Sequence, residues 1–131
     1  MKVTLRFSPY MRGPDLEAEI DAVVRGDLAI HRYATVTPEG VLDIGKSWTV
    51  SHVPTKDKLS SALPRRLRDY RVTRRELIAW AEAIQAACPA FFEAARDPEA
   101  YRAAMLKEQR TGNNGPLSAL ARDVINKGYS L

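Results

Sequence analysis

The amino-acid sequence predicts an α+β fold, with a small antiparallel sheet and one helix in the N-terminal half and a helical C-terminal half packed on that sheet. Strand patterns are grouped before residue 54 and helical patterns mostly after residue 72, a grouping that favours α+β over a doubly wound sheet. A length of 131 residues suits one packed core, so we expect a single domain over residues 1–131.

The strands are predicted from alternation of apolar and polar residues. Lys2 to Phe7 alternates strictly, and Trp48 to Val53 alternates with β-branched and aromatic types. Ala29 to Val36 and Val41 to Ile44 form a further strand pair, because Thr37 to Gly40 fits a β-turn with Pro at its second position and Gly at its fourth. Gly45 is expected to mark a bulge or a bend before Ser47, where the last strand begins.

The helices are predicted from three- and four-residue spacing. Pro14 to Arg25 has this spacing, with Pro14 in the first turn and Gly26 after the end. Thr73 to Glu76 fits a capping box, which predicts a helix from Thr73 to about Cys88, packed through Trp80 and Ile84 on the sheet that carries Trp48. Helices are also expected at 89–96, 98–110 and 116–127.

The positive charge is concentrated in one segment. The chain has twenty basic and sixteen acidic residues, and the basic residues are mostly arginine. Between residues 46 and 75 there are nine basic residues against two acidic ones, whereas the rest of the chain is slightly acidic. Because arginine pairs bidentately with phosphate or carboxylate, this segment favours an anionic partner. The alternative is a solvated charged loop without a partner.

We therefore assign partner binding to the basic side chains of this segment and one tyrosine: Lys56, Lys58, Arg65, Arg66, Arg68, Tyr70, Arg71, Arg74 and Arg75. Trp48, Tyr70 and Trp80 lie near them in the sequence and offer stacking faces, although Trp80 fits better in the core.

The sequence offers little for catalysis, metal binding or a cofactor. His31, His52 and Cys88 lack the spacing of a zinc site, and no glycine-rich phosphate loop is present. His52 beside the arginines fits a general acid or base acting on a phosphodiester, but a hydrogen-bonded structural histidine fits better, because no orienting residue or pocket is evident beside it. We predict a protein that is not an enzyme and binds no metal or cofactor.

The expected location is the cytoplasm. Cys88 has no partner for an internal disulfide, and the chain opens without the pattern of a secretory signal. No apolar run is long enough to cross a bilayer, so we expect no membrane association.

The segment Trp48-Thr-Val-Ser-His-Val-Pro-Thr55, followed by a helix that begins Thr73-Arg-Arg-Glu-Leu-Ile-Ala, resembles small proteins of bacteriophages, prophages and plasmids that have no assigned function. In them a glycine often follows the threonine, whereas this chain has Lys56. The resemblance covers about a third of the chain and implies a mobile-element setting, in which small proteins regulate genes or inhibit host complexes.

Together these observations lead to one expected function and two alternatives. The expected function is a non-enzymatic, anti-CRISPR-like inhibitor or modulator of a host nucleic-acid-handling or defence complex, acting through the basic segment. The first alternative is a DNA- or RNA-binding regulator, and the second is a small nuclease-like enzyme that uses His52.

Overall fold

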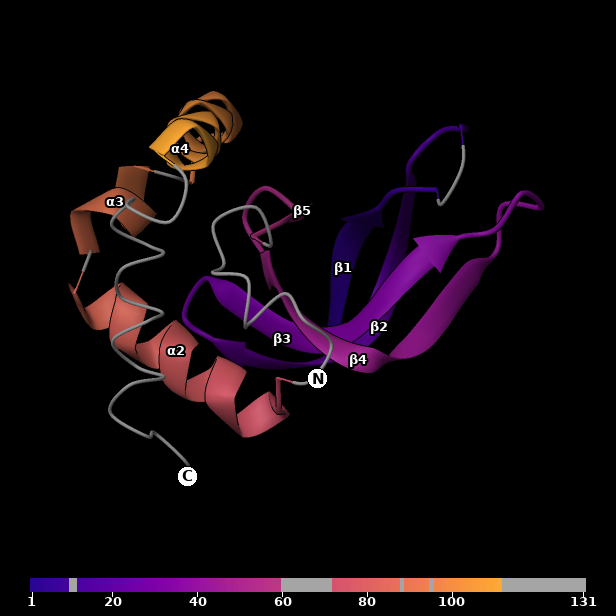
Figure 1. Cartoon of the computed structure of the whole chain (residues 1–131), viewed down its shortest axis with the longest axis horizontal. Helices are drawn as coiled ribbons and strands as arrows, with labels where there is room; N and C mark the ends of the chain where they lie inside the picture. Colours follow the sequence, from indigo (N-terminus) through magenta and orange to yellow (C-terminus); the bar gives the residue numbers. More distant parts are fainter. Residues whose placement is uncertain (10–11, 60–71, 88, 95, 112–131) are drawn as a thin grey trace.

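The computed structural model describes residues 1–9, 12–59, 72–87, 89–94 and 96–111, and most of it is one curled antiparallel sheet (Figure 1). The five strands stand side by side in chain order, and each pairs antiparallel with the next. They are β1 (Lys2–Phe7), β2 (Leu16–Arg25), β3 (Leu28–Val36), β4 (Leu42–His52) and β5 (Asp57–Lys58). The helices after them are α2 (Arg74–Ala87), α3 (Pro89–Ala94) and α4 (Pro98–Thr111).

The predicted α+β arrangement is wrong, because a half-barrel sheet dominates the fold. The sheet curls until β5 returns to β1, where the Arg6 N–H donates to the Lys56 carbonyl at 2.9 Å. Helix α2 lies along the sheet, while α3 and α4 continue from its end on the side of β5 (Figure 1). The chain after the sheet is therefore not a helical half packed on it.

The largest local error is the predicted helix from Pro14 to Arg25, which is strand β2. Its inward side chains include Ala18 and Ala22, and its outward ones include Glu17 and Glu19, so the period is two. Pairing with β1 places Lys2 opposite Asp21 and Arg6 opposite Glu17. Cross-strand charge pairs and a buried alternate face thus select the strand over the helix.

The predicted turn between β3 and β4 is confirmed. The Gly40 N–H donates to the Thr37 carbonyl at 2.9 Å, and Gly40 has a φ of +80°, a conformation that glycine adopts without strain. Strand β4 is continuous where the sequence predicted two strands. The register of the hairpin shifts between Arg32 and Ala34, so that Arg32 lies opposite Trp48.

Two hydrophobic cores lie on opposite faces of the curled sheet. The concave side encloses a cluster from β1, β2 and β3, in which Leu5, Phe7 and Ala29 are fully or almost fully buried. The other side carries Leu28, Ile30 and Val50, which pack with the apolar stripe of α2. The apolar side chains of β3 therefore contribute to both cores, because successive side chains of a strand point to opposite faces.

Helix α2 matches its prediction closely. The Glu76 N–H donates to the Thr73 hydroxyl at 3.1 Å, and the Thr73 N–H donates to the Glu76 carboxylate at 3.3 Å, which completes the capping box. Trp80 and Ile84 have no exposed surface and belong to the same core as Val50, and Trp48 packs at its edge. None of the helices described is both long and apolar enough to cross a membrane.

Candidate functional site

The structure places only four of the nine predicted partner-binding residues, since Arg65, Arg66, Arg68, Tyr70 and Arg71 lie outside the described residues. The four are Lys56, Lys58, Arg74 and Arg75, and they occupy three different environments.

Lys56 and Lys58 are engaged with the protein itself. The Lys56 amine pairs with Glu17 at 3.2 Å, and this hydrogen bond is the main reason why the pKa of Glu17 is lowered. Lys58 is half-buried, and its amine lies 4.5 Å from the centroid of the Tyr33 ring. Burial lowers the pKa of Lys58, against the opposing charge of Asp15. Neither lysine extends freely into solvent.

Arg74 and Arg75 are exposed at the start of α2. The guanidinium carbon of Arg74 lies 5.6 Å from the centroid of Trp48. A second arginine, Arg32 of β3, lies over the same indole at 4.6 Å. Both distances fall within the range of cation–π contacts. The indole of Trp48 on β4 is therefore in contact with one guanidinium group from the neighbouring strand β3 and one from helix α2.

Arg32 is also held from its other side. One of its guanidinium nitrogens donates to the Lys46 carbonyl at 2.7 Å, which fixes the side chain along the bulged part of β4. Lys46 itself is exposed. We call this set the Trp48 surface: the half-buried Trp48 with the exposed Arg32 and Arg74 over its ring, together with the exposed Lys46.

Arg32 and Arg74 differ from most other described arginines in having no carboxylate partner among the residues that the structure describes. Arg6 forms ion pairs with Glu17 and Asp57, and Arg102 approaches the same Asp57. Arg25 pairs with Glu82, and Arg96 pairs with Asp27. Within the described part of the chain, no carboxylate pairs with Arg32 or Arg74. Among the described residues, these two positive charges are therefore not paired with a carboxylate, and both lie close to an aromatic face.

The sequence could not place Arg32 in this surface. A hairpin with the turn at Thr37 to Gly40 and no bulge would pair Arg32 with Lys46. The observed register shift adds two residues to β4, which moves Trp48 opposite Arg32. The sequence signal was the glycine at position 45, which marked an irregularity without giving its size.

His52 lies in the core between the sheet and the helices and has no exposed surface. Its Nδ1 is 2.9 Å from the Thr55 hydroxyl, and its Nε2 has no hydrogen-bond partner among the described residues. Burial lowers the pKa of His52, although Asp27 and Asp57 act in the opposite direction. A neutral, enclosed imidazole of this kind has no face open to a substrate.

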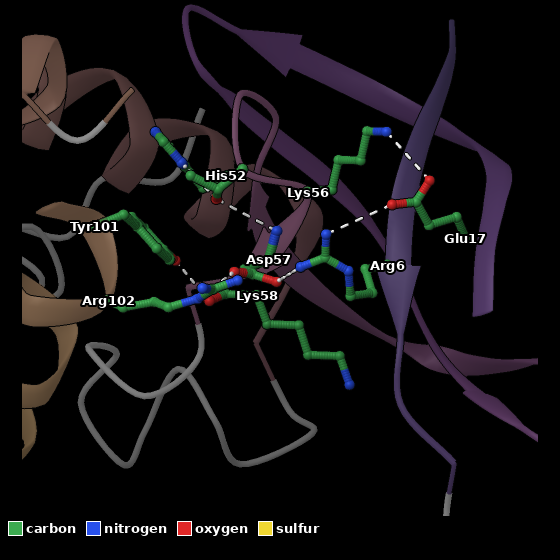
Figure 2. A network of polar contacts seen from close by, with 9 residues as sticks. Arg6, Glu17, His52, Lys56, Asp57, Lys58, Tyr101 and Arg102 are labelled. Atoms are coloured by element: carbon green, nitrogen blue, oxygen red, sulfur yellow. Dashed lines mark hydrogen bonds and ion pairs between the residues drawn. The ribbon is translucent and has the colours of Figure 1, made fainter. Parts of the chain in front are cut away.

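Tyr101 of α4 closes this histidine from solvent, and Figure 2 shows the two rings beside the ion pairs of β5. The rings are stacked with centroids 4.6 Å apart and planes 4° apart. The Tyr101 hydroxyl donates to the Lys58 carbonyl at 2.6 Å, and burial raises the pKa of Tyr101. This contact attaches α4 to the sheet.

The ion pairs in Figure 2 join β1, β2 and β5. Arg6 bonds to Asp57 at 2.8 Å and reaches Glu17 at 3.5 Å, while Arg102 approaches Asp57 at 4.0 Å. Because Arg6 and Asp57 are only partly exposed, this network helps close the half-barrel next to the backbone bond between Arg6 and Lys56. Each charged side chain of this network therefore has at least one oppositely charged neighbour within it.

His31 occupies the concave side of the sheet, where it is fully buried. Its Nδ1 donates to the Arg32 carbonyl at 2.7 Å, which leaves Nε2 to accept from the Ser51 hydroxyl at 2.8 Å. Burial lowers the pKa of His31 to about 4. The Ser51–His31 pair resembles the start of a nucleophilic dyad, but both residues are enclosed and so serve packing rather than catalysis.

A cleft of about 480 Å³ lies between the loop after β1 and the β3–β4 turn, and it is lined largely by prolines, glycines and aliphatic residues. Arg12, Asp15 and Glu39 are its charged residues, and all three are exposed. The cleft shares no residue with the Trp48 surface.

No group of three metal-ligating side chains occurs among the residues that the structure describes. Comparison with family models, with curated proteins and with solved structures finds no match to this chain.

Proposed function

We propose that this chain is a non-enzymatic binding protein that inhibits or modulates a host nucleic-acid-handling or defence complex, in the manner of an anti-CRISPR protein. The Trp48 surface docks on an acidic surface of that complex. The mobile-element setting comes from the sequence resemblance alone, whereas the docking surface is argued from the geometry.

One observation carries the proposal: Arg32 and Arg74 share the Trp48 ring and have no carboxylate among the described residues. A guanidinium that lies over an aromatic face keeps donors for a bidentate oxyanion contact, and its restricted position lowers the entropy lost on binding. Clustered positive charge also speeds the encounter with an acidic surface. The predicted basic residues Arg65, Arg66, Arg68 and Arg71 precede α2 in the sequence and lie outside the described residues.

A DNA- or RNA-binding regulator is the second candidate, because exposed arginines beside an aromatic ring that is only partly buried also suit single-stranded nucleic acid. The nuclease alternative has less support, since His52 is buried beneath Tyr101.

The test is capture of partners from a host lysate by three proteins: the wild type, Arg32→Gln/Arg74→Gln, and the control Lys2→Gln/Arg12→Gln. The control removes the same charge from exposed positions outside the Trp48 surface. We expect the wild type and the control to retain one protein complex after nuclease treatment, and the Trp48-surface variant to lose it. Loss of every partner on nuclease treatment would favour the regulator, and equal capture by all three proteins would refute docking through this surface.

A further inference from the structure

The cleft between the loop after β1 and the β3–β4 turn lies at one end of the sheet. Because the antiparallel strands follow chain order, the connections after β1 and after β3 leave the sheet at the same end, as Figure 1 shows. The cleft volume of about 480 Å³ is within the range of small-molecule sites. A ligand there would bind independently of the Trp48 surface, because the two share no residue.

Both walls of the cleft are fixed by backbone hydrogen bonds. The Val36 N–H donates to the Ser8 carbonyl at 3.2 Å, which joins the start of the loop to the end of β3. In the turn, the Thr37 N–H donates to the Val41 carbonyl at 2.8 Å. Three prolines, whose rings fix their own φ, are among the lining residues: Pro9, Pro14 and Pro38. Because the walls are preformed, little protein entropy is lost when a ligand binds.

The apolar part of the lining reaches the concave core of the sheet. Leu16 at the start of β2 is half-buried, and Val36 at the end of β3 is buried, and both pack in the core that contains Leu5 and Phe7. Together with the proline rings they give the cleft an apolar surface. The apolar body of a ligand would displace water from this surface, which favours binding.

The charged part of the lining has one carboxylate on each wall. Asp15 lies on the loop and Glu39 on the turn, and both are exposed. Among the described residues, neither carboxylate forms an ion pair; the charge of Asp15 acts on the Lys58 amine only from a longer distance. Arg12 is the one positively charged residue of the described lining. The lining therefore has a net negative charge and two carboxylates without an ion-pair partner.

We propose that this cleft binds a small organic cation with an apolar body. The cationic group is held near the carboxylates of Asp15 and Glu39, while the apolar body packs on the prolines and on Leu16 and Val36. A single positive charge balances the net charge of the lining. A neutral ligand would gain only the apolar contacts, and an anion would be repelled by both carboxylates.

The first measurement compares three probes with the same apolar body: phenylbutylamine, the neutral phenylbutanol and the anionic phenylbutyrate. Binding is followed by NMR through the backbone amides of the labelled protein. We expect phenylbutylamine to shift the amides of Gly13, Asp15 and Gly40 saturably. The alcohol should bind about two- to fivefold more weakly, as expected for loss of an exposed charge pair, and the acid more weakly still. Equal affinities for amine and alcohol, preference for the acid, or saturable shifts only elsewhere would refute the proposal, as would the absence of binding.

The second measurement uses charge variants whose expected effects have opposite signs. Asp15→Asn and Glu39→Gln should each weaken phenylbutylamine binding about two- to fivefold, whereas Arg12→Gln should strengthen it. The control Glu19→Gln removes an exposed carboxylate of β2 that does not line the cleft, and it should bind like the wild type. If both carboxylate variants bind like the control, or if Arg12→Gln binds more weakly than the wild type, the proposal is wrong.

A steric variant tests the place of binding. A Cβ at Gly13 would lie 3.7 Å from the Pro9 ring, an ordinary contact, so Gly13→Leu can fill the cleft without overlapping that ring. We expect this variant, once shown to be folded by circular dichroism, to lose phenylbutylamine binding. Retained binding would place the probe elsewhere and refute the proposal. Arg32→Gln/Arg74→Gln should bind the probe like the wild type, so failure of this site and failure of the Trp48 surface are distinguishable.

Discussion

The ring of Tyr101 lies parallel to the ring of His52, 4.6 Å away, and its hydroxyl donates to the carbonyl of Lys58. A residue of α4 thereby covers a buried histidine of β4 and completes the hydrogen bonding of β5. Tyr101 is only 2% exposed. The attachment of α4 to the sheet thus depends strongly on one side chain.

Two substitutions separate the contributions of Tyr101. Tyr101→Phe keeps the stack on His52 and loses one hydrogen bond, so it should reduce the free energy of unfolding by about 1 kcal/mol. Tyr101→Ala also loses the buried ring and should cost about 3–5 kcal/mol. Urea unfolding followed by circular dichroism measures both losses. Equal losses in the two variants would mean that the ring contributes nothing to stability.

Trp80 should be a core residue without a polar role. It is fully buried, and its indole N–H has no partner among the described residues. Trp80→Ala should reduce the free energy of unfolding by about 3–5 kcal/mol. Trp80→Phe should cost clearly less, because it retains an aromatic ring and breaks no described hydrogen bond. A loss below about 1 kcal/mol for the alanine variant would contradict the observed burial.

The turn between β2 and β3 is bound by a side chain of α2. Gln85 accepts from the Asp27 N–H at 2.9 Å and donates to the Arg25 carbonyl at 2.7 Å. Gly26, between them, has a φ of +60°, and a Cβ there would lie 2.3 Å from the Gln85 amide oxygen. A larger residue at position 26 would have to displace Gln85 and break these bonds.

Gly26→Ala should therefore destabilise the protein in two ways. The positive φ costs about 1–2 kcal/mol, and displacement of Gln85 adds to that loss. In a Gln85→Ala background only the first cost remains, so a double-mutant cycle on the free energy of unfolding should give a coupling of at least about 0.5 kcal/mol. Additive losses would show that Gln85 and residue 26 do not interact.

Stability should fall as the pH falls below neutrality. The pKa of His31 is lowered from 6.5 to about 4 in the folded protein, so between these values the unfolded chain binds more protons than the folded one. The free energy of unfolding should drop by about 2 kcal/mol between about pH 7.5 and about pH 5 from His31 alone. His52, whose pKa is also lowered, acts with the same sign.

Urea unfolding at the two pH values, together with an NMR titration of the His31 ring, tests this dependence. Glu17 should stay ionised across this range because its pKa is lowered, so its ion pairs persist. If the folded His31 titrates near pH 6.5, the argument from burial is wrong.

The sequence predicted some elements well because their signals are local. The capping box of Thr73 and Glu76 places the start of α2, and the proline and glycine of residues 37–40 place the β3–β4 turn. The sequence of strand β2 predicts a helix because the apolar residues Leu16, Ile20, Val23 and Val24 also fit helical spacing. The inward-facing residues Ala18 and Ala22 follow the two-residue period of a strand, but they are small and weakly apolar. Their burial becomes evident only when β2 is paired with β1.

The candidate site was predictable only in part. A basic segment near Trp48 could be identified from charge and aromatic content, and Arg74 is indeed beside that indole. The place of Arg32 depends on the size of the β4 bulge, and the engagement of Lys58 depends on the curl of the sheet. Both are tertiary features that charge counting cannot give.

The Trp48 surface should bind acidic polymers directly. Fluorescence anisotropy with labelled poly-glutamate at low salt would measure the affinity of wild type, Arg32→Gln/Arg74→Gln and Lys2→Gln/Arg12→Gln, each first shown to be folded by circular dichroism. A hydrogen bond to a charged group contributes about 1.5–3 kcal/mol, and 1.4 kcal/mol is a factor of ten in affinity.

We predict a loss of at least tenfold for Arg32→Gln/Arg74→Gln and of no more than about twofold for the control, with wild-type affinity falling as salt is added. Equal affinities of the two double variants would contradict the assignment of anion binding to the two arginines on Trp48.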